Sequence, residues 1–246
     1  MKIGFFGDSY IDTVWHRRQN PNIPPGRKIW AHRLLDELDA PFICSGLGGT
    51  SQYYAVAEWK RWSTKINFDV AIFTFTWPHR LYTNNLTERV ITAKIEGRDL
   101  GELAAKEAEI QDAADKYYRY LYSKEEHEFE FELMVKWCLE LPKQFPNTKF
   151  IFLPNTVSSQ EIAKKYFTQG VLVDFAFETL SLAEGERVGV APYIMDRTGH
   201  LSDHAHDCVK DVVKDIIVNY EQRRDTVYPI NLDSFGLKQL FFNLYD

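Results

Sequence analysis

The sequence is poor in cysteine, and the few cysteines that it has follow no recognisable pattern. Only Cys44, Cys138 and Cys208 occur among its 246 residues. Their number is odd and their spacing is wide, and no Cys-x-x-Cys pair or zinc-type spacing is present. We therefore expect reduced thiols, as in proteins that stay inside the cell.

Long apolar runs and an excess of positive charge are also missing. No hydrophobic stretch is long enough to span a bilayer, so we expect no membrane span. The N-terminus shows no signal peptide, because Lys2 leads straight into a short apolar run that ends in a glycine turn. We expect a cytoplasmic protein, with release by lysis or on a virus particle left open. The net charge of -6 argues against a general nucleic-acid binder.

Several familiar motifs are absent as well. The chain has no Walker A sequence, no clean dinucleotide fingerprint and no His-Glu-x-x-His metal motif. It also lacks the Gly-x-Ser-x-Gly elbow of the α/β-hydrolases. We see no internal repeat and no low-complexity segment. We therefore expect a globular protein whose activity must be sought in other motifs.

The segments that are present alternate between strand-like and helix-like patterns. Short apolar runs over residues 3–6, 41–44, 69–75, 149–153 and 171–175 predict five strands. Residues 28–38 and 206–220 carry apolar side chains at helical spacing. Thr50 or Ser51 is expected to cap a further helix that runs to about Trp62. Strands that alternate with helices predict an α/β fold with a parallel sheet. We expect a single domain over residues 1–246.

Two segments do not fit this alternation. Residues 86–145 are rich in Glu, Lys, Ala and Tyr, and we predict helices over 100–121 and 125–141. This stretch is longer than a crossover needs, so it is predicted to be a helical insertion after the third strand. Covering one sheet face is its simplest role, with a lid or an oligomer contact as alternatives. Residues 226–246 are predicted to form a C-terminal tail that packs on the body or on a partner.

Three predicted loops carry residues that could do chemistry. Ser9 follows the first strand in Gly7-Asp8-Ser9, and a glycine turn that contains Gly49 follows the second. Asp196 and His200 lie in a late loop before the last predicted helix. The carboxyl ends of parallel strands meet at one edge of a sheet, where ligands bind. Ester hydrolysis needs a nucleophile, a base, a group that orients the base and donors for the oxyanion, and these loops supply all four.

These blocks resemble those of the SGNH, or GDSL, hydrolases. Gly7-Asp8-Ser9 matches the first block of that family directly after the first strand. Residues 44–51 (Cys-Ser-Gly-Leu-Gly-Gly-Thr-Ser) are similar to its second block, Asn-x-Gly-x-x-Gly-x-Thr, with Cys44 in place of the Asn and Ser51 in place of the Thr. An Asp-and-His block precedes the last helix. The resemblance implies a three-layer α/β/α sandwich, flavodoxin-like, around a five-stranded parallel sheet.

The resemblance also implies roles for individual residues. Ser9 corresponds to the nucleophile, His200 to the base and Asp196 to the residue that orients the base. The main-chain N–H groups of Ser9 and Gly49 correspond to oxyanion donors. The implied activity is that of an esterase, acting on an ester bond through a Ser–His–Asp mechanism without a cofactor.

The chain departs from the family pattern in its third block. The family has Gly-x-Asn-Asp after the third strand, and the Asn side chain is an oxyanion donor. Thr76 stands at that place here, and we assign it and Asp8, with Gly49, to the oxyanion or binding groups. Asn84 and Asn85 are later candidates for the same role. Loss of one oxyanion donor typically costs two to three orders of magnitude in rate, so a weakened enzyme or a binding module is an alternative.

The last block departs in its spacing. The family has Asp-x-x-His, whereas Asp196 and His200 are separated by one residue more. Asp203 and His206 have the family spacing and are the alternative pair. We favour His200, because Leu201-Ser202 after it resembles the family sequence and His206 is predicted to lie in the helix.

Two further questions concern metal and substrate. The cluster of His200, His204 and His206 could instead hold a divalent metal ion in a metal-assisted hydrolase. For the esterase, the expected partner is a small-molecule or carbohydrate ester, with an oligomer left open. Trp15 and Trp77, near the predicted loops, could stack on a sugar ring, so an O-acetyl group on carbohydrate is one expected substrate. A lipid or a small ester fits the sequence equally well.

Overall fold

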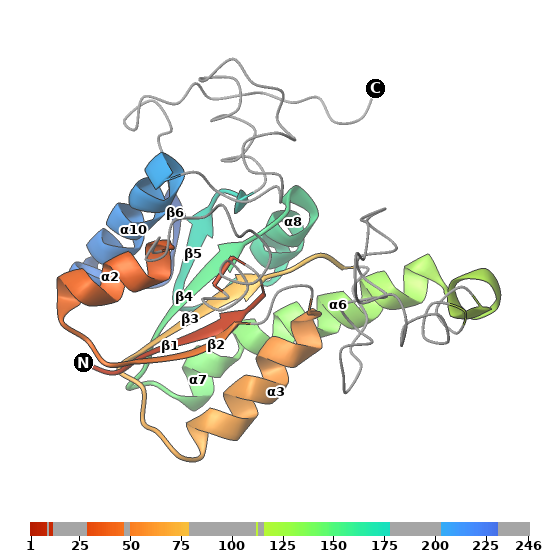
Figure 1. Cartoon of the computed structure of the whole chain (residues 1–246), viewed down its shortest axis with the longest axis horizontal. Coiled ribbons are helices and arrows are strands. Elements are labelled where there is room, and N and C mark those ends of the chain that lie inside the picture. Colours follow the sequence, from red (N-terminus) through yellow and green to blue (C-terminus); the bar gives the residue numbers. More distant parts are fainter. Residues whose placement is uncertain are drawn as a thin grey trace.

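The computed structural model of the chain describes residues 1–8, 10–11, 29–46, 50–78, 112, 116–177 and 203–230. Within this part, a parallel sheet has the strand order β2-β1-β3-β4-β5-β6 (Figure 1). Its strands are β1 (Ile3–Gly7), β2 (Phe42–Gly46), β3 (Val70–Phe75), β4 (Lys149–Pro154), β5 (Val171–Asp174) and β6 (Thr226–Pro229). The first five strands are those predicted from the apolar runs.

The first residues of the predicted C-terminal tail form a sixth strand, which the sequence did not indicate. Residues 231–246 lie outside the described residues, so the rest of the tail stays a prediction. β6 pairs in parallel with β5 at the edge of the sheet. Its start is held by Asp225, whose Oδ1 accepts the main-chain N–H of Gly170 at 2.9 Å. Only Tyr228 of the four strand residues is partly buried. An edge strand that buries so little has no apolar pattern from which it could be predicted.

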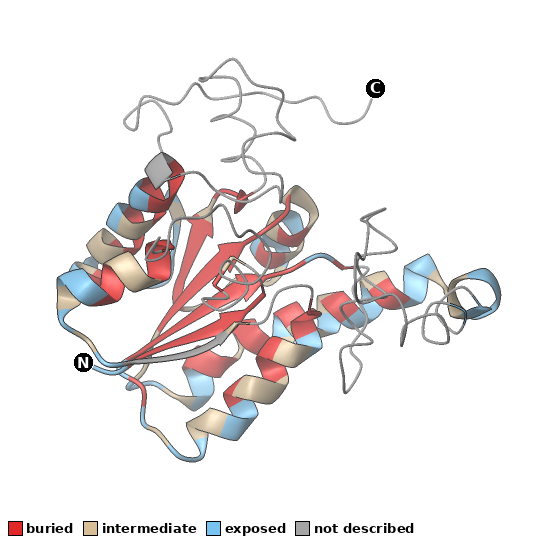
Figure 2. Cartoon of the chain, in the orientation of Figure 1, coloured by how far each residue is buried: buried red, intermediate tan, exposed pale blue. Residues whose placement is uncertain are grey.

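Helices cover both faces of the sheet, as the three-layer prediction requires (Figures 1 and 2). One face carries α2 (Trp30–Leu38), α10 (Asp203–Val218) and α11 (Tyr220–Arg223). The other carries α3 (Gln52–Ser63), α6 (Lys124–Leu139), α7 (Leu141–Gln144) and α8 (Val157–Tyr166). None of these helices in the described part of the chain is both long and apolar enough to cross a membrane.

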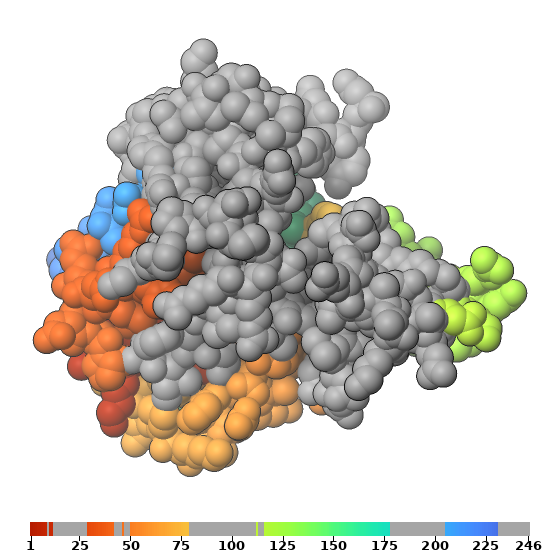
Figure 3. All heavy atoms as spheres, viewed as in Figure 1, coloured from red at the N-terminus to blue at the C-terminus, as the bar shows by residue number. Residues whose placement is uncertain are grey.

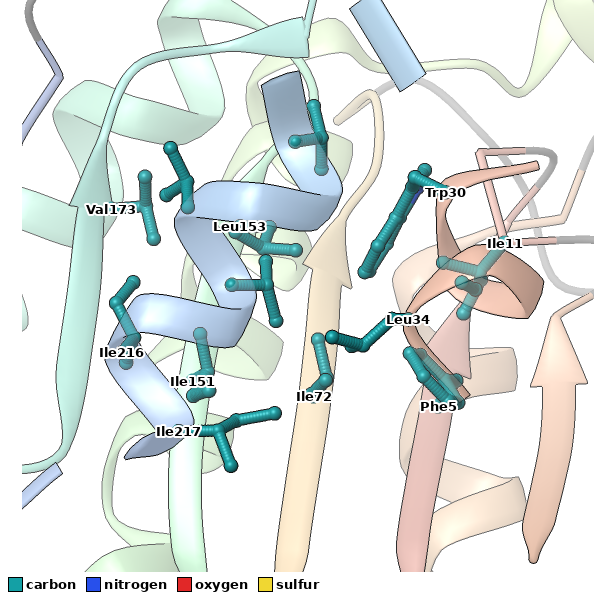
Figure 4. Packing of buried hydrophobic residues seen from close by; sticks show 14 of the residues in the cluster. Phe5, Ile11, Trp30, Leu34, Ile72, Ile151, Leu153, Val173, Ile216 and Ile217 are labelled. Atoms are coloured by element: carbon teal, nitrogen blue, oxygen red, sulfur yellow. The ribbon is translucent and has the colours of Figure 1, made fainter. Parts of the chain in front are cut away.

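The strands supply a different type of side chain to each face. Ile72, Ile151 and Val173 point toward α2 and α10, where they meet Leu34 and Ile216 (Figure 4). The residues that alternate with them point toward α3 and α6 and are mostly aromatic. Side chains of neighbouring residues point to opposite faces of a strand, so a continuous apolar run serves both layers.

The aromatic face is organised around one tryptophan. The Trp59 ring, from α3, lies 5.3 Å from the Phe6 ring and 5.4 Å from the Phe150 ring, centroid to centroid. Both contacts are edge-to-face, an arrangement that aromatic pairs prefer. These rings therefore fix α3 across β1 and β4.

The described part of the predicted insertion lies on this aromatic face. α6 corresponds to the helix predicted over 125–141, and its Phe131 and Val135 are buried in the core. The helix packs beside α3 and α8 and lies between β3 and β4 in the chain. Its N-terminal end extends beyond the sheet (Figures 1 and 3). Phe129, in the first half of the helix, is 60% exposed. Most of the helix predicted over 100–121 lies outside the described residues.

Candidate active site

The predicted site divides into residues that the structure describes and residues that it does not. Ser9, Gly49, Asp196 and His200 lie outside the described residues, so their roles stay predictions. The same holds for Asn84, Asn85 and Trp15. Asp8, Thr76 and His206 are described with their side chains, whereas Asp203 is described only as the first residue of α10.

Asp8 is buried at the carboxyl end of β1, with 1% of its surface exposed. Its carboxylate accepts the Thr76 hydroxyl at 2.8 Å and the main-chain N–H of Tyr10 at 3.2 Å. Its own N–H donates to Thr74 Oγ1 at 3.4 Å. A Cβ added at Gly7 would lie 1.8 Å from that same Thr74 oxygen, so only glycine fits there. The turn that leads to Ser9 is therefore fastened to β3.

Thr76 also holds this turn in place through hydrogen bonds. Its hydroxyl donates to Asp8, and its main-chain N–H donates to Gln52 Oε1 at 3.2 Å. The Gln52 Nε2 group lies 3.8 Å from Cys138 Sγ on α6, and burial raises the pKa of that thiol. The Thr76 hydroxyl, which the sequence offers as an oxyanion donor, is thus engaged by the Asp8 carboxylate. An oxyanion could receive it only if this bond were broken.

His206, the alternative base, lies in the first turns of α10 and is 2% exposed. Its Nδ1 atom accepts the main-chain N–H of Trp30 at 3.2 Å. Trp30 is the first residue of α2, and the preceding Ile29 has no side-chain oxygen to cap the helix. Accepting at Nδ1 requires that nitrogen to be unprotonated. A triad base uses the opposite arrangement, in which Nδ1–H faces a carboxylate and Nε2 accepts the nucleophile's proton.

The segment after Ser9 contacts α2 and the residues that follow β5. The Trp30 indole N–H donates to the carbonyl of Tyr10 at 2.9 Å. The Tyr10 ring stacks on Phe177 beyond β5, with centroids 4.7 Å apart. Contacts between residues far apart in sequence therefore fix the chain on both sides of the predicted nucleophile.

The metal alternative finds no support in the described residues, which contain no group of three or more His, Cys, Asp or Glu side chains that could hold an ion. His200 and the side chain of His204 lie outside this part of the chain. The proposed cluster of His200, His204 and His206 therefore stays a prediction.

Two polar side chains at this edge were not predicted from the sequence. Gln52, from α3, joins Thr76 to the aromatic face. Asn155, 3% exposed, follows β4, and its main-chain N–H donates to the Phe75 carbonyl at 2.8 Å. The sequence shows that Asn155 follows a strand, but only the sheet order places it beside the end of β3.

No protein-family model and no curated protein matches the sequence. Solved structures do match the fold. A GDSL-like lipase from Parabacteroides merdae ATCC 43184 is 14% identical, over 89% of this chain and 95% of that chain, with a TM-score of 0.51. Axe2, an acetylxylan esterase from Geobacillus stearothermophilus, is also 14% identical, over 88% of this chain and 93% of that chain, with a TM-score of 0.48. The chain thus shares the three-layer α/β/α fold of a GDSL-like lipase over most of its length, and the fold expected from the sequence resemblance is confirmed.

Proposed function

We propose that the protein is a serine hydrolase that cleaves an ester bond, with Ser9 as nucleophile, His200 as base and Asp196 as the residue that orients the base. The observation that carries the proposal is the place of Gly7 and Asp8 in the sheet. Gly7 ends β1 and Asp8 follows it, and β1 lies between β2 and β3, where the strand order reverses. Ligands of open α/β sheets bind outside the carboxyl ends of the strands at such a switch point.

The reaction follows from the roles that the resemblance implies. His200 takes the proton of the Ser9 hydroxyl as Ser9 Oγ attacks the ester carbonyl carbon. The tetrahedral intermediate collapses, and the alcohol leaves with the proton that His200 returns. Water then attacks the acyl-enzyme with His200 again as base, which releases the acid and restores Ser9.

The buried contacts around Asp8 support this assignment. A nucleophile needs a fixed position, because a small displacement from the attack geometry costs much of the rate. The bonds from Asp8 to Thr76 and Thr74 hold the turn before Ser9 against β3. The Nδ1 contact of His206 with Trp30 favours His200 over His206 as the base.

The substrate proposed is an O-acetyl group on carbohydrate. Its support is Trp77, which directly follows the buried Thr76 and is 38% exposed. An exposed indole beside the end of β3 offers a flat apolar surface to a sugar ring. We expect Trp77→Ala to raise KM for acetylated oligosaccharides and to leave p-nitrophenyl acetate hydrolysis unchanged. The exposed Phe129 on α6 provides a control, since Phe129→Ala should affect neither substrate.

Labelling with a fluorophosphonate probe tests the mechanism. The wild-type protein, Ser9→Ala and His200→Ala are treated with the probe, and circular dichroism confirms that each variant is folded. We expect labelling of the wild type, none in Ser9→Ala and a large decrease in His200→Ala. Turnover of p-nitrophenyl acetate should likewise be highest in the wild type, much lower in His200→Ala and absent in Ser9→Ala.

Equal labelling or turnover in the wild type and Ser9→Ala would overturn the proposal. Labelling that depends on Ser9 but is unchanged in His200→Ala would remove His200 as the base. A His206→Gln variant should keep the activity of the folded protein, which separates the two histidines.

A further inference from the structure

Asn155 has a side-chain amide that the fold buries without a partner. Neither its Oδ1 nor its Nδ2 atom has a hydrogen-bond partner among the residues that the structure describes. Both atoms are buried, and the residue is 3% exposed. Exchanging the amide oxygen and nitrogen does not change this, because both lack partners. A buried polar group without a hydrogen bond is costly, so it calls for an explanation.

The polar groups around Asn155 are all paired, which makes the amide an exception. Its main-chain N–H donates to the Phe75 carbonyl at 2.8 Å. Thr156 and Ser159 form a capping box at the start of α8, in which Thr156 N–H donates to Ser159 Oγ at 3.0 Å and Ser159 N–H to Thr156 Oγ1 at 3.1 Å. The Ser159 hydroxyl in turn donates to the Thr156 carbonyl at 2.8 Å. These hydrogen bonds fix the segment, and within it the Asn155 amide is the group that has no hydrogen-bond partner in the described part of the chain.

The position of this amide is set by the register of the sheet. Phe75 pairs with Pro154, so Asn155 follows β4 where Thr76 follows β3. Thr76 in turn reaches Asp8, which precedes Ser9. Neighbouring strands lie about 5 Å apart, so Asn155 is about 10 Å across the sheet from the end of β1. Asn155 and the turn before Ser9 therefore lie at the same edge of the sheet, on either side of the end of β3.

We propose that the Asn155 side-chain N–H donates a hydrogen bond to the ester carbonyl oxygen of the substrate and to the oxyanion that forms from it. The inference deepens the proposed function and rests on it. An amide is a neutral donor, and a fixed donor in a site that excludes water stabilises a developing oxyanion strongly. The Thr76 hydroxyl, which is held by Asp8, is not needed for this role.

The test compares two asparagine-to-alanine variants of the full-length protein. Asn219 is the matched control, because its Nδ2 is paired with Asp215 Oδ1 at 2.7 Å in a different part of the fold. Turnover of p-nitrophenyl acetate, the rate of fluorophosphonate labelling and the melting temperature are measured for both. We expect Asn155→Ala to lower kcat about 100- to 1000-fold and to slow labelling, with little effect on KM or on the melting temperature. We expect Asn219→Ala to lower the melting temperature slightly and to leave kcat unchanged.

Three results would overturn the inference. One is a kcat for Asn155→Ala close to that of the wild type in a protein whose activity depends on Ser9, which would leave the proposed function standing. The second is a rise in KM alone, which would assign the amide to ground-state binding instead. The third is a wild-type protein without Ser9-dependent turnover, which would remove the proposed function together with the inference. Asn155→Asp adds a check, since an ionised carboxylate of the same shape should be at least as harmful to kcat as alanine.

Discussion

The carboxyl ends of β3 and β4 are neighbours, and each is followed by a buried polar side chain. The two side chains differ in whether they have a hydrogen-bond partner. The Thr76 hydroxyl, after β3, donates to the Asp8 carboxylate at 2.8 Å, and the Thr76 main-chain N–H donates to Gln52 Oε1. Asn155 after β4 is as deeply buried and has no side-chain partner in the described part of the protein. A paired buried group holds the fold together, whereas an unpaired one costs stability and is expected to serve a ligand.

The largest stability effect is expected at the paired group. Thr76→Val keeps the shape of the side chain but removes the hydroxyl donor from a buried carboxylate. Hydrogen bonds to charged groups contribute about 2 kcal/mol, so we expect this loss in the free energy of unfolding and a melting temperature about 6 °C lower. Thr76→Ser keeps the hydroxyl and should lose less. Chemical denaturation of the three proteins measures the difference, and equal stabilities would show that the bond to Asp8 contributes nothing.

The opposite outcome is expected at the unpaired group. Asn155→Ala removes an amide that has no protein partner, so the lost packing is offset by the relief of a buried unsatisfied group. We expect the free energy of unfolding to change by less than about 1 kcal/mol, in either direction. The same denaturation experiment measures it. A loss as large as that of Thr76→Val would show that the amide is paired in solution and would end the contrast between the two strand ends.

The smallest effect on stability is expected for an ion pair that is exposed to solvent. Glu37 on α2 is exposed and binds two lysines of α10, Lys214 and, at 3.0 Å, Lys210. These lysines hold the pKa of the Glu37 carboxyl below its ordinary value, chiefly through the Lys214 hydrogen bond. A lowered pKa means that the contribution to stability is present above the unfolded pKa and is lost as the pH falls through the folded one.

Thermal unfolding of Glu37→Gln at two pH values measures this effect. At pH 7 we expect a small decrease in melting temperature relative to wild type, since exposed ion pairs stabilise proteins weakly and are screened by salt. The ordinary pKa of a Glu carboxyl is about 4. At a pH well below that value, the difference in melting temperature should disappear, because the Glu37 carboxyl is then protonated. A difference that grows toward acid pH would contradict the assigned ion pairs.

Much of the fold could be predicted because its signals are local. The run from Val70 to Phe75 is apolar except for Thr74, as expected for a strand buried on both faces. The helical spacing of Val209, Val213 and Ile216 identifies the buried side of α10. Residues 226–229 were predicted as part of a tail, because β6 buries too little to leave a pattern.

The site could be predicted only in part, because its contacts join distant residues. The Gly7-Asp8-Ser9 turn follows from its place after an apolar run. The bond between Asp8 and Thr76 spans 68 positions, and the bond between Trp30 and His206 spans 176. No pattern in the sequence distinguishes the paired Thr76 from the unpaired Asn155, since each is a polar residue after an apolar strand.

The sequence by itself determined the first five strands, the main helices that it predicted and the place of the Gly-Asp-Ser turn, because side-chain periodicity and turn chemistry act over a few residues. The tertiary structure alone decided which polar groups find partners. It engages the Thr76 hydroxyl with Asp8, makes His206 an acceptor for the start of α2 and leaves the Asn155 amide unpaired. Hydrogen bonding depends on distance and direction in space, and the order of the strands in the sheet sets both.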